Sequence, residues 1–223
     1  LQVGIVGASG FTGSELMRLI ATHPDMELVV ATGDTQAGSR VRDLYPNLAA
    51  EYSDLVYSEY SASELEGLDA VFLGLPHMAS QPIVSELFKK VGCILDLGSD
   101  FRLKDPNLYP QWYGDEHSVP ELLDHFVYGL PEIFRSEMEG ARGIAVPGCY
   151  PTAASLALYP FVAAGKVEQT GVIVDAASGV SGAGRAAKAN TTFASVDENF
   201  NAYGLLTHRH TPEIEQVSGC EIL

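Results

Sequence analysis

Short apolar runs alternate with amphipathic segments along the first two thirds of the chain. Continuous apolar runs of about four to eight residues are typical of buried parallel strands, and the segments between them predict helices. One helix, at residues 13–22, places Leu16, Leu19 and Ile20 on a single face, and another begins near Ser80 and Pro82 and extends to about residue 90. Strands are predicted at residues 1–6, 27–32, 68–75, 93–97 and 143–146.

This alternation of strands and helices is the pattern of an α/β protein with a doubly wound, Rossmann-type sheet. We predict a cofactor domain over residues 1–146, with the turn-rich, aromatic residues 103–142 packed on it. A second, α+β domain for catalysis and dimerisation is predicted over residues 147–223. Its elements are a helix at residues 151–158 and a strand of a second sheet at residues 171–176.

Composition narrows the class of protein. The 223 residues are 46% hydrophobic, yet no run approaches the roughly 20 apolar residues of a membrane helix, so we expect a cytoplasmic protein. A formal net charge of −16 argues against nucleic acid and anionic membranes as partners, but leaves small anionic ligands open. The three cysteines are widely spaced, and they indicate neither a disulfide framework nor a metal site.

The first predicted strand leads directly into a glycine-rich turn with the spacing Gly-x-x-Gly-x-x-Gly. Such glycines permit a tight turn and close approach to a pyrophosphate, and the following helix points its N-terminus at the phosphates. A plain strand-helix turn is the alternative, but the position between a first strand and an amphipathic helix favours a dinucleotide. The residues predicted to bind it are Gly7, Ser9, Gly10, Phe11, Thr12 and Gly13.

The end of the second predicted strand bears on the choice between NAD and NADP. Asp34 would accept a hydrogen bond from a free ribose hydroxyl and favour NAD. Thr32, Ser39 and Arg40 would surround a 2′-phosphate and favour NADP. A solvated polar loop is the remaining interpretation of these residues.

Cys149 is the predicted nucleophile. Gly148 lets the backbone approach a ligand closely, and Pro151 suits the first position of a helix, so the thiol is expected at a helix N-terminus. There the helix dipole favours the reactive thiolate. A buried small hydrophobe is the alternative, and it is the preferred interpretation of Cys93 and Cys220.

Two further segments carry polar groups suited to catalysis. Arg102 follows a predicted strand and can bind phosphate through two hydrogen bonds, with a surface salt bridge as the alternative. His208 and His210 would share one face if their segment is extended, and either can complete a Cys-His pair. We favour His210, because a helix starting at Thr211 and Pro212 would disfavour the imidazolium form.

Taken together, these motifs resemble the N-acetyl-gamma-glutamyl-phosphate reductases of the semialdehyde dehydrogenase superfamily. The resemblance spans the chain. Its specific stretches are the one around Cys149 and the His-Arg-His stretch, whereas many enzymes share the glycine loop. The matching residues are 7–13, 74–77, 96–103, 128–132, 147–152, 178–185 and 203–216.

This resemblance implies NADPH as cofactor, Cys149 as nucleophile, His208 or His210 as acid/base, and an acyl phosphate of arginine biosynthesis as substrate. An aspartate-semialdehyde dehydrogenase-like enzyme and a non-catalytic NADP-binding module are the alternatives. Members of the family continue beyond the equivalent of Leu223, so we expect an incomplete second domain that associates into a homo-oligomer. It also implies cofactor contacts from Pro76, Ser178 and Gly179, and substrate contacts from Arg102, Arg185, Tyr203, Arg209 and Glu213.

Three positions depart from the family pattern. Val146 replaces a usual asparagine, Ala177 replaces a common lysine, and Asp34 replaces a frequent arginine. The last departure weakens the expectation of NADP over NAD.

Overall fold

The computed structural model describes residues 1–223 and divides into two compact units. Unit 1 comprises Leu1–Phe101 and His117–Val146, and unit 2 comprises Arg102–Glu116 and Pro147–Leu223. The expectation that all of residues 103–142 pack on the first domain is therefore wrong for residues 103–116. This segment is tied to the second unit through its backbone, because the N–H of Lys104 donates to Oε1 of Gln216 over 2.8 Å.

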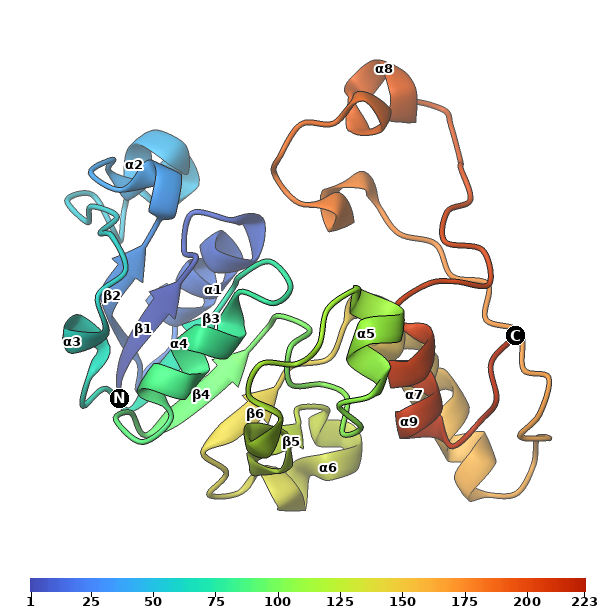
Figure 1. Ribbon diagram of the computed structural model, residues 1–223. Coiled ribbons are helices and arrows are strands. Elements are labelled where there is room, and N and C mark those ends of the chain that lie inside the picture. Colours follow the sequence, from blue (N-terminus) through green and yellow to red (C-terminus); the bar gives the residue numbers. More distant parts are fainter. The chain divides into compact units, whose positions relative to one another are not determined.

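Unit 1 is built on a six-stranded sheet in the order β2-β1-β3-β4-β6-β5, and every pair of neighbours is parallel. The five predicted strands are confirmed, and β5 is an additional one. It has only three residues, which is too short to show a hydrophobic period. The strands are β1 (Gln2–Val6), β2 (Glu27–Thr32), β3 (Ala70–Leu73), β4 (Cys93–Asp96), β5 (Phe126–Tyr128) and β6 (Gly143–Ala145) (Figure 1).

Helices connect the strands and make up most of the regular structure of unit 2. None of them is long and apolar enough to cross a membrane. Unit 1 contains α1 (Phe11–Ala21), α2 (Val41–Leu44), α3 (Ala62–Leu65), α4 (Ser80–Leu87) and α6 (Pro131–Met138). Unit 2 contains α5 (Leu108–Tyr113), α7 (Cys149–Ala163), α8 (Phe193–Val196) and α9 (Thr211–Ser218).

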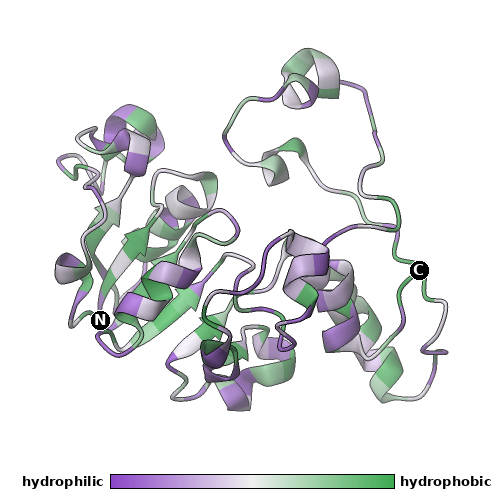
Figure 2. Cartoon of the chain, in the orientation of Figure 1, coloured by the Kyte–Doolittle hydropathy of each residue, from purple (hydrophilic) through white to green (hydrophobic).

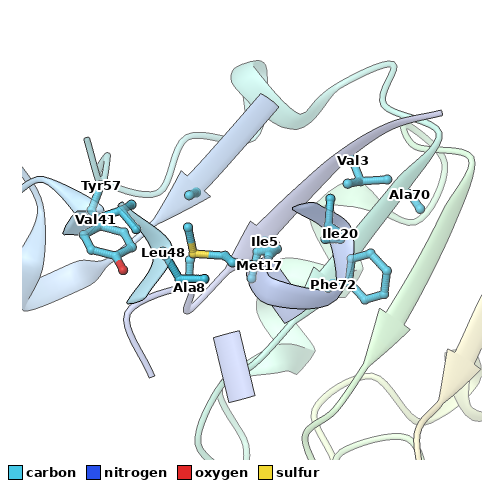
Figure 3. Close-up of a cluster of buried hydrophobic side chains, with 11 residues drawn as sticks. Val3, Ile5, Ala8, Met17, Ile20, Val41, Leu48, Tyr57, Ala70 and Phe72 are labelled. Atoms are coloured by element: carbon cyan, nitrogen blue, oxygen red, sulfur yellow. The ribbon is translucent and has the colours of Figure 1, made fainter. Parts of the chain in front are cut away.

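The core of unit 1 lies where α1 covers the sheet. Met17 and Ile20 of α1 belong to the same buried cluster as Val3 and Ile5 of β1 and Phe72 of β3, as Figure 3 shows. The strands β1, β3 and β4 are mostly green in Figure 2, as expected for a sheet buried on both faces. Each such side chain contributes about 1.5–3 kcal/mol on burial, so the start of α1 is anchored firmly beside the loop after β1.

The order of the strands reverses between β1 and β3, and two glycines meet there. Gly7 follows β1 with φ +88°, and a Cβ on it would lie 2.4 Å from the carbonyl oxygen of Gly74, which follows β3. Neither the φ nor the close approach suits another residue. Open α/β sheets bind ligands at this reversal, outside the carboxyl ends of the strands.

Unit 2 packs α7 against α9, but the predicted strand at residues 171–176 is wrong. Only Val172 pairs, forming an isolated parallel bridge with Ile222. Two backbone hydrogen bonds accompany it, from Val172 N to Glu221 O at 3.1 Å and from Leu223 N to Val172 O at 2.9 Å. An apolar, β-branched run becomes a strand only where a neighbouring backbone supplies a full ladder of partners.

Candidate active site

Cys149 is the first residue of α7, and Gly148 is the N-cap. The helix begins two residues before Pro151, so the predicted element is confirmed with an earlier start. Gly148 supplies no side-chain cap, and the Cys149 side chain is exposed at the positive end of the helix. Cys220 is buried, and burial raises the pKa of the half-buried Cys93. Cys149 is thus the cysteine whose position best suits a reactive thiolate.

Arg102 lies inside unit 2 and makes no surface salt bridge. Its side chain is 8% exposed, and its Nη1 is 3.5 Å from Oε2 of Glu213, whose side chain is 0% exposed. A guanidinium can be buried this deeply only with a compensating charge. The same carboxylate also reaches the loop before the cysteine, where its Oε1 accepts a hydrogen bond of 3.0 Å from the N–H of Gly148.

Gly148 is required by the side chains around it. A Cβ at this position would lie 2.8 Å from Nε2 of His210 and 2.9 Å from Nη1 of Arg102. The prediction assigned this free space to a ligand, but two side chains of the chain itself occupy it. The glycine thereby brings an imidazole and a guanidinium against the residue that precedes Cys149.

The two histidines come together through a turn, so the extended segment on which their shared face depended does not form. The N–H of His210 donates to Nδ1 of His208 over 3.1 Å, and their rings stand edge to face with centroids 4.7 Å apart. His210 is the N-cap of α9, and Thr211 is the first helical residue, so the predicted start of the helix at Thr211 and Pro212 is confirmed. Pro212 explains the start of this helix, because its fixed φ suits the first turn.

Burial keeps His210 neutral. It lowers the pKa of His210 to about 3, with smaller contributions from the charges of His208, Arg102 and Arg209. Burial and Arg209 also lower the pKa of His208. The lowered pKa of His210 agrees with the expectation of a neutral imidazole. Its main cause is burial, however, and not the helix dipole on which the prediction rested.

Tyr150 is a member of the site that the prediction missed. Its ring contacts His208 and His210 edge-on, with centroid distances of 5.2 and 5.9 Å. Its hydroxyl accepts a hydrogen bond of 2.9 Å from the exposed Tyr203, which places that predicted substrate residue beside the histidines. The sequence signal that could have identified Tyr150 is its position, as an aromatic residue directly after the predicted nucleophile.

In unit 1 the glycine loop fits the phosphates of a dinucleotide. Gly10 caps α1 without a side chain, which leaves N–H groups of the first turn, at Phe11 and Thr12, for an anion. A Cβ on Gly13 would lie 2.5 Å from the carbonyl oxygen of Gly7, so the loop cannot close with a larger residue there. The hydroxyl of Ser9 secures the loop by donating to the carbonyl of Gly33 over 3.1 Å.

Thr32 has a different environment from the predicted one. It is 3% exposed, and its hydroxyl accepts a hydrogen bond of 3.3 Å from the N–H of Gly7. A residue buried in this way holds the loop and does not present its hydroxyl to a ribose. Ser39 is half-buried and Arg40 exposed, and Asp34 is exposed with φ +44°.

The other predicted residues lie on exposed segments, and their roles stay predictions. Pro76 precedes His77, whose Nδ1 lies 2.9 Å from Oγ of Ser99 in unit 1. The other predicted site residues, which are all exposed, are Pro76 in unit 1 and Ser178, Gly179, Arg185 and Arg209 in unit 2.

Two family models match the chain, and the first of them includes residues 102–116 of unit 2. Residues 2–141 match the family model of the semialdehyde dehydrogenase NAD binding domain, and residues 149–221 match that of the semialdehyde dehydrogenase dimerisation domain. The chain is 49% identical over 217 residues to the N-acetyl-gamma-glutamyl-phosphate reductase of Symbiobacterium thermophilum, covering 97% of this chain and 62% of that protein. For the reductase of Pseudomonas aeruginosa PAO1, identity is 46% over 216 residues, covering 97% and 63%. The chain thus spans less than two thirds of these relatives.

Solved structures share the fold at low sequence identity. Aspartate semialdehyde dehydrogenase II of Vibrio cholerae has a TM-score of 0.57 and 16% identity, covering 100% of this chain and 68% of that one. The Candida albicans aspartate semialdehyde dehydrogenase, solved with NADP, has a TM-score of 0.50 and 18% identity, covering 76% and 48%. Both family models together extend over nearly all of residues 1–223, and the chain belongs to the semialdehyde dehydrogenase family.

Proposed function

We propose that the chain provides the cofactor-binding and catalytic parts of an NADPH-dependent reductase that converts N-acetyl-L-glutamyl 5-phosphate into N-acetyl-L-glutamate 5-semialdehyde and phosphate, a step of arginine biosynthesis. The observation that carries the proposal is the packing of His210 and Arg102 against Gly148, directly before Cys149. The names of the relatives at 45–49% identity support the choice of substrate.

The thiol begins the reaction. At the start of α7 the helix dipole favours the thiolate of Cys149, which attacks the acyl carbon of the substrate. A carbon–sulfur bond forms, the bond from that carbon to the phosphate oxygen breaks, and phosphate leaves a thioester on Cys149. NADPH, when bound, supplies the hydride that reduces the thioester to the aldehyde.

His210 and Arg102 serve the two other demands of this chemistry. A pKa of about 3 leaves the imidazole of His210 neutral at pH 7 but only weakly basic. We assign the transfer of the thiol proton to Nε2 of His210, and this role requires that its pKa rises when the ligands bind. Arg102 carries a permanent charge and several N–H donors, which suits it to bind the phosphate that leaves. Tyr150 packs edge-on against both imidazoles and so helps to fix their positions.

The cofactor would be held by the loop Gly7–Gly13 and the start of α1, whose close backbone contacts fit a pyrophosphate. With Thr32 turned to Gly7, we assign the 2′-phosphate of NADP to Ser39 and Arg40. The NADP in the related Candida albicans structure supports this assignment. Weaker binding of NADPH after Arg40→Ala, with NADH binding unchanged, would support it further.

We also propose that the chain functions as a homo-oligomer. The family model matched by residues 149–221 is described as a dimerisation domain, and large apolar side chains are exposed within this region. Phe193, Phe200 and Leu206 are 78%, 79% and 83% exposed. Association would bury such exposed apolar side chains, and light scattering across a concentration series measures the resulting mass.

An assay in the oxidative direction tests the proposed reaction. Purified chain is mixed with NADP, phosphate and either N-acetylglutamate semialdehyde or aspartate semialdehyde, with the full-length Symbiobacterium thermophilum relative as positive control. We expect phosphate-dependent NADPH formation, with a higher kcat/KM for the acetylated substrate. Preference for aspartate semialdehyde would identify the alternative enzyme, and NADP binding without turnover would identify a non-catalytic module.

A further inference from the structure

We infer that Glu213 is a positioning residue that holds Arg102 and the start of α7 together, instead of a residue that contacts the substrate. Its predicted role was a substrate contact, by resemblance. The inference deepens the proposed function, on which its phosphate-binding part rests, but the contacts of Glu213 within the protein do not depend on that function.

The carboxylate of Glu213 joins two helices at their N-termini. It is the third residue of α9, a position from which a glutamate commonly turns back to the N–H of its own N-cap. Here its Oε1 accepts from the N–H of Gly148, the N-cap of α7, over 3.0 Å. The start of the helix that carries Cys149 is therefore fixed by a side chain of α9.

The second oxygen of Glu213 faces Arg102. Oε2 is 3.5 Å from Nη1 of the guanidinium, and the glutamate side chain is 0% exposed. A carboxylate this deeply buried, with one oxygen on a backbone N–H and the other on a guanidinium, is poorly placed to bind a ligand. The guanidinium has five N–H donors in a planar fork, so one contact with Glu213 is compatible with binding phosphate as well.

One turn later in α9, Gln216 holds the backbone of the same arginine. Its Nε2 donates to the carbonyl oxygen of Arg102 over 2.9 Å, and its Oε1 accepts from the N–H of Lys104 over 2.8 Å. Residues three apart lie on one face of a helix, so Glu213 and Gln216 form a single contact surface. This surface of α9 holds Arg102 at both its charged end and its main chain.

His210 completes the arrangement, because it precedes Glu213 by three residues and its Nε2 packs against Gly148 beside Nη1 of Arg102. The first turn of α9 thus fixes the positions of the His210 imidazole, the Arg102 guanidinium and the start of α7. Without its carboxylate partner, the buried guanidinium would be uncompensated and would turn toward water. We therefore expect loss of Glu213 to weaken phosphate binding through Arg102.

A double-mutant cycle tests this dependence. The four proteins are wild type, Glu213→Gln, Arg102→Gln and the double variant, and Glu215→Gln serves as control. Glu215 lies on the same helix and accepts from the N–H of Ile222 over 3.0 Å, a bond that glutamine can keep. The first readout is the concentration of inorganic phosphate that half-protects Cys149 from alkylation by iodoacetamide. The second is the equilibrium constant for unfolding in urea.

If Glu213 acts through Arg102, Glu213→Gln raises the half-protecting phosphate concentration about tenfold in the wild-type background and less than about twofold in the Arg102→Gln background. Glu215→Gln leaves it unchanged. If Glu213→Gln changes the half-protecting phosphate concentration equally in the two backgrounds, Glu213 contacts the ligand directly. This result would overturn the inference.

The unfolding cycle separates failure of the inference from failure of the proposed function. The unfolding constant of the double variant should differ at least about fivefold from the product of the single effects, because each single variant leaves one buried charge unpaired. Independent effects on unfolding would overturn the inference. Absence of phosphate protection in wild type, together with coupled unfolding, would instead reject the phosphate site and keep the positioning role.

Discussion

Nε2 of His210 lies 2.8 Å from the point that a Cβ on Gly148 would occupy. The backbone of Gly148, with φ −66° and ψ 161°, is accessible to any residue, so alanine would act here through this contact alone. Gly148→Ala should displace His210 or Arg102 and lower kcat/KM more than about tenfold, with a loss of stability of about 1–3 kcal/mol. Steady-state kinetics and urea unfolding measure both effects, and unchanged values for both would mean that this packing has no role.

Cys149→Ser should abolish turnover and leave the affinity for NADP within a few fold. The hydroxyl is nearly isosteric with the thiol but far less nucleophilic. Cys93→Ser and Cys220→Ser are the matched controls, because Cys93 is half-buried and Cys220 buried, whereas Cys149 is exposed. Turnover and cofactor titration on all three variants decide the assignment, which retained activity of Cys149→Ser would refute.

Arg102→Ala should raise the KM for phosphate in the oxidative direction about ten- to a hundredfold, with much less effect on the KM for NADP. Loss of a charged hydrogen-bonded contact costs about 1.5–3 kcal/mol, which corresponds to this range. Arg18→Ala, which removes an exposed ion pair with Glu15 in α1, serves as control. If the two variants have the same phosphate dependence, Arg102 does not bind the anion.

Stability should depend on pH through His210. Its folded pKa of about 3 lies below the ordinary value of 6.5, so the unfolded chain binds a proton more readily between these values. His210 therefore lowers stability as the pH falls from about 6.5 toward 3, by at most about 1.4 kcal/mol per pH unit. Urea unfolding at several pH values, compared with His210→Asn, isolates this slope.

The matched control for that slope is His23→Asn, which replaces an exposed histidine in unit 1. The difference in unfolding free energy between wild type and His210→Asn should change with pH in this range, in the direction that disfavours wild type in acid. A constant difference would show that His210 titrates alike in the folded and unfolded chain.

The choice between the two histidines has its own test. Substituting each with asparagine and following the alkylation of Cys149 against pH separates a proton acceptor from a substrate contact. Loss of the group that accepts the proton of Cys149 should slow its alkylation at neutral pH. We expect this loss of rate for His210→Asn and not for His208→Asn. The reverse result would exchange their roles.

The parallel sheet was predictable because its strands are buried on both faces and appear as continuous apolar runs. Residues 70–73 show this clearly, and the glycine loop follows β1 as the motif requires. The short β5 shows no hydrophobic period. Residues 171–176 have the apolar pattern of a strand, but only Val172 pairs with another backbone segment. The local sequence of a segment indicates its propensity to form a strand, but it does not show whether another strand lies beside it as a partner.

In the site, local features were predictable and long-range contacts were not. The helix beside Cys149 and the helix after His210 follow from local glycine and proline signals, although α7 begins two residues before the predicted Pro151. The pairing of Glu213 with Gly148 joins residues 65 positions apart, and no spacing in the sequence indicates it. The burial that lowers the pKa of His210 arises from the same packing, which explains why its cause was misassigned.

Formation of a thioester on Cys149 is the most direct test of the proposed chemistry, and it requires neither cofactor nor complete turnover. The chain is mixed with N-acetylglutamyl phosphate, digested in acid and analysed by mass spectrometry, with Cys149→Ser in parallel. We predict release of phosphate and one N-acetylglutamyl group on the peptide that contains Cys149, and no adduct on the serine variant. An unmodified Cys149, or an equal adduct in both proteins, would contradict its role as the nucleophile.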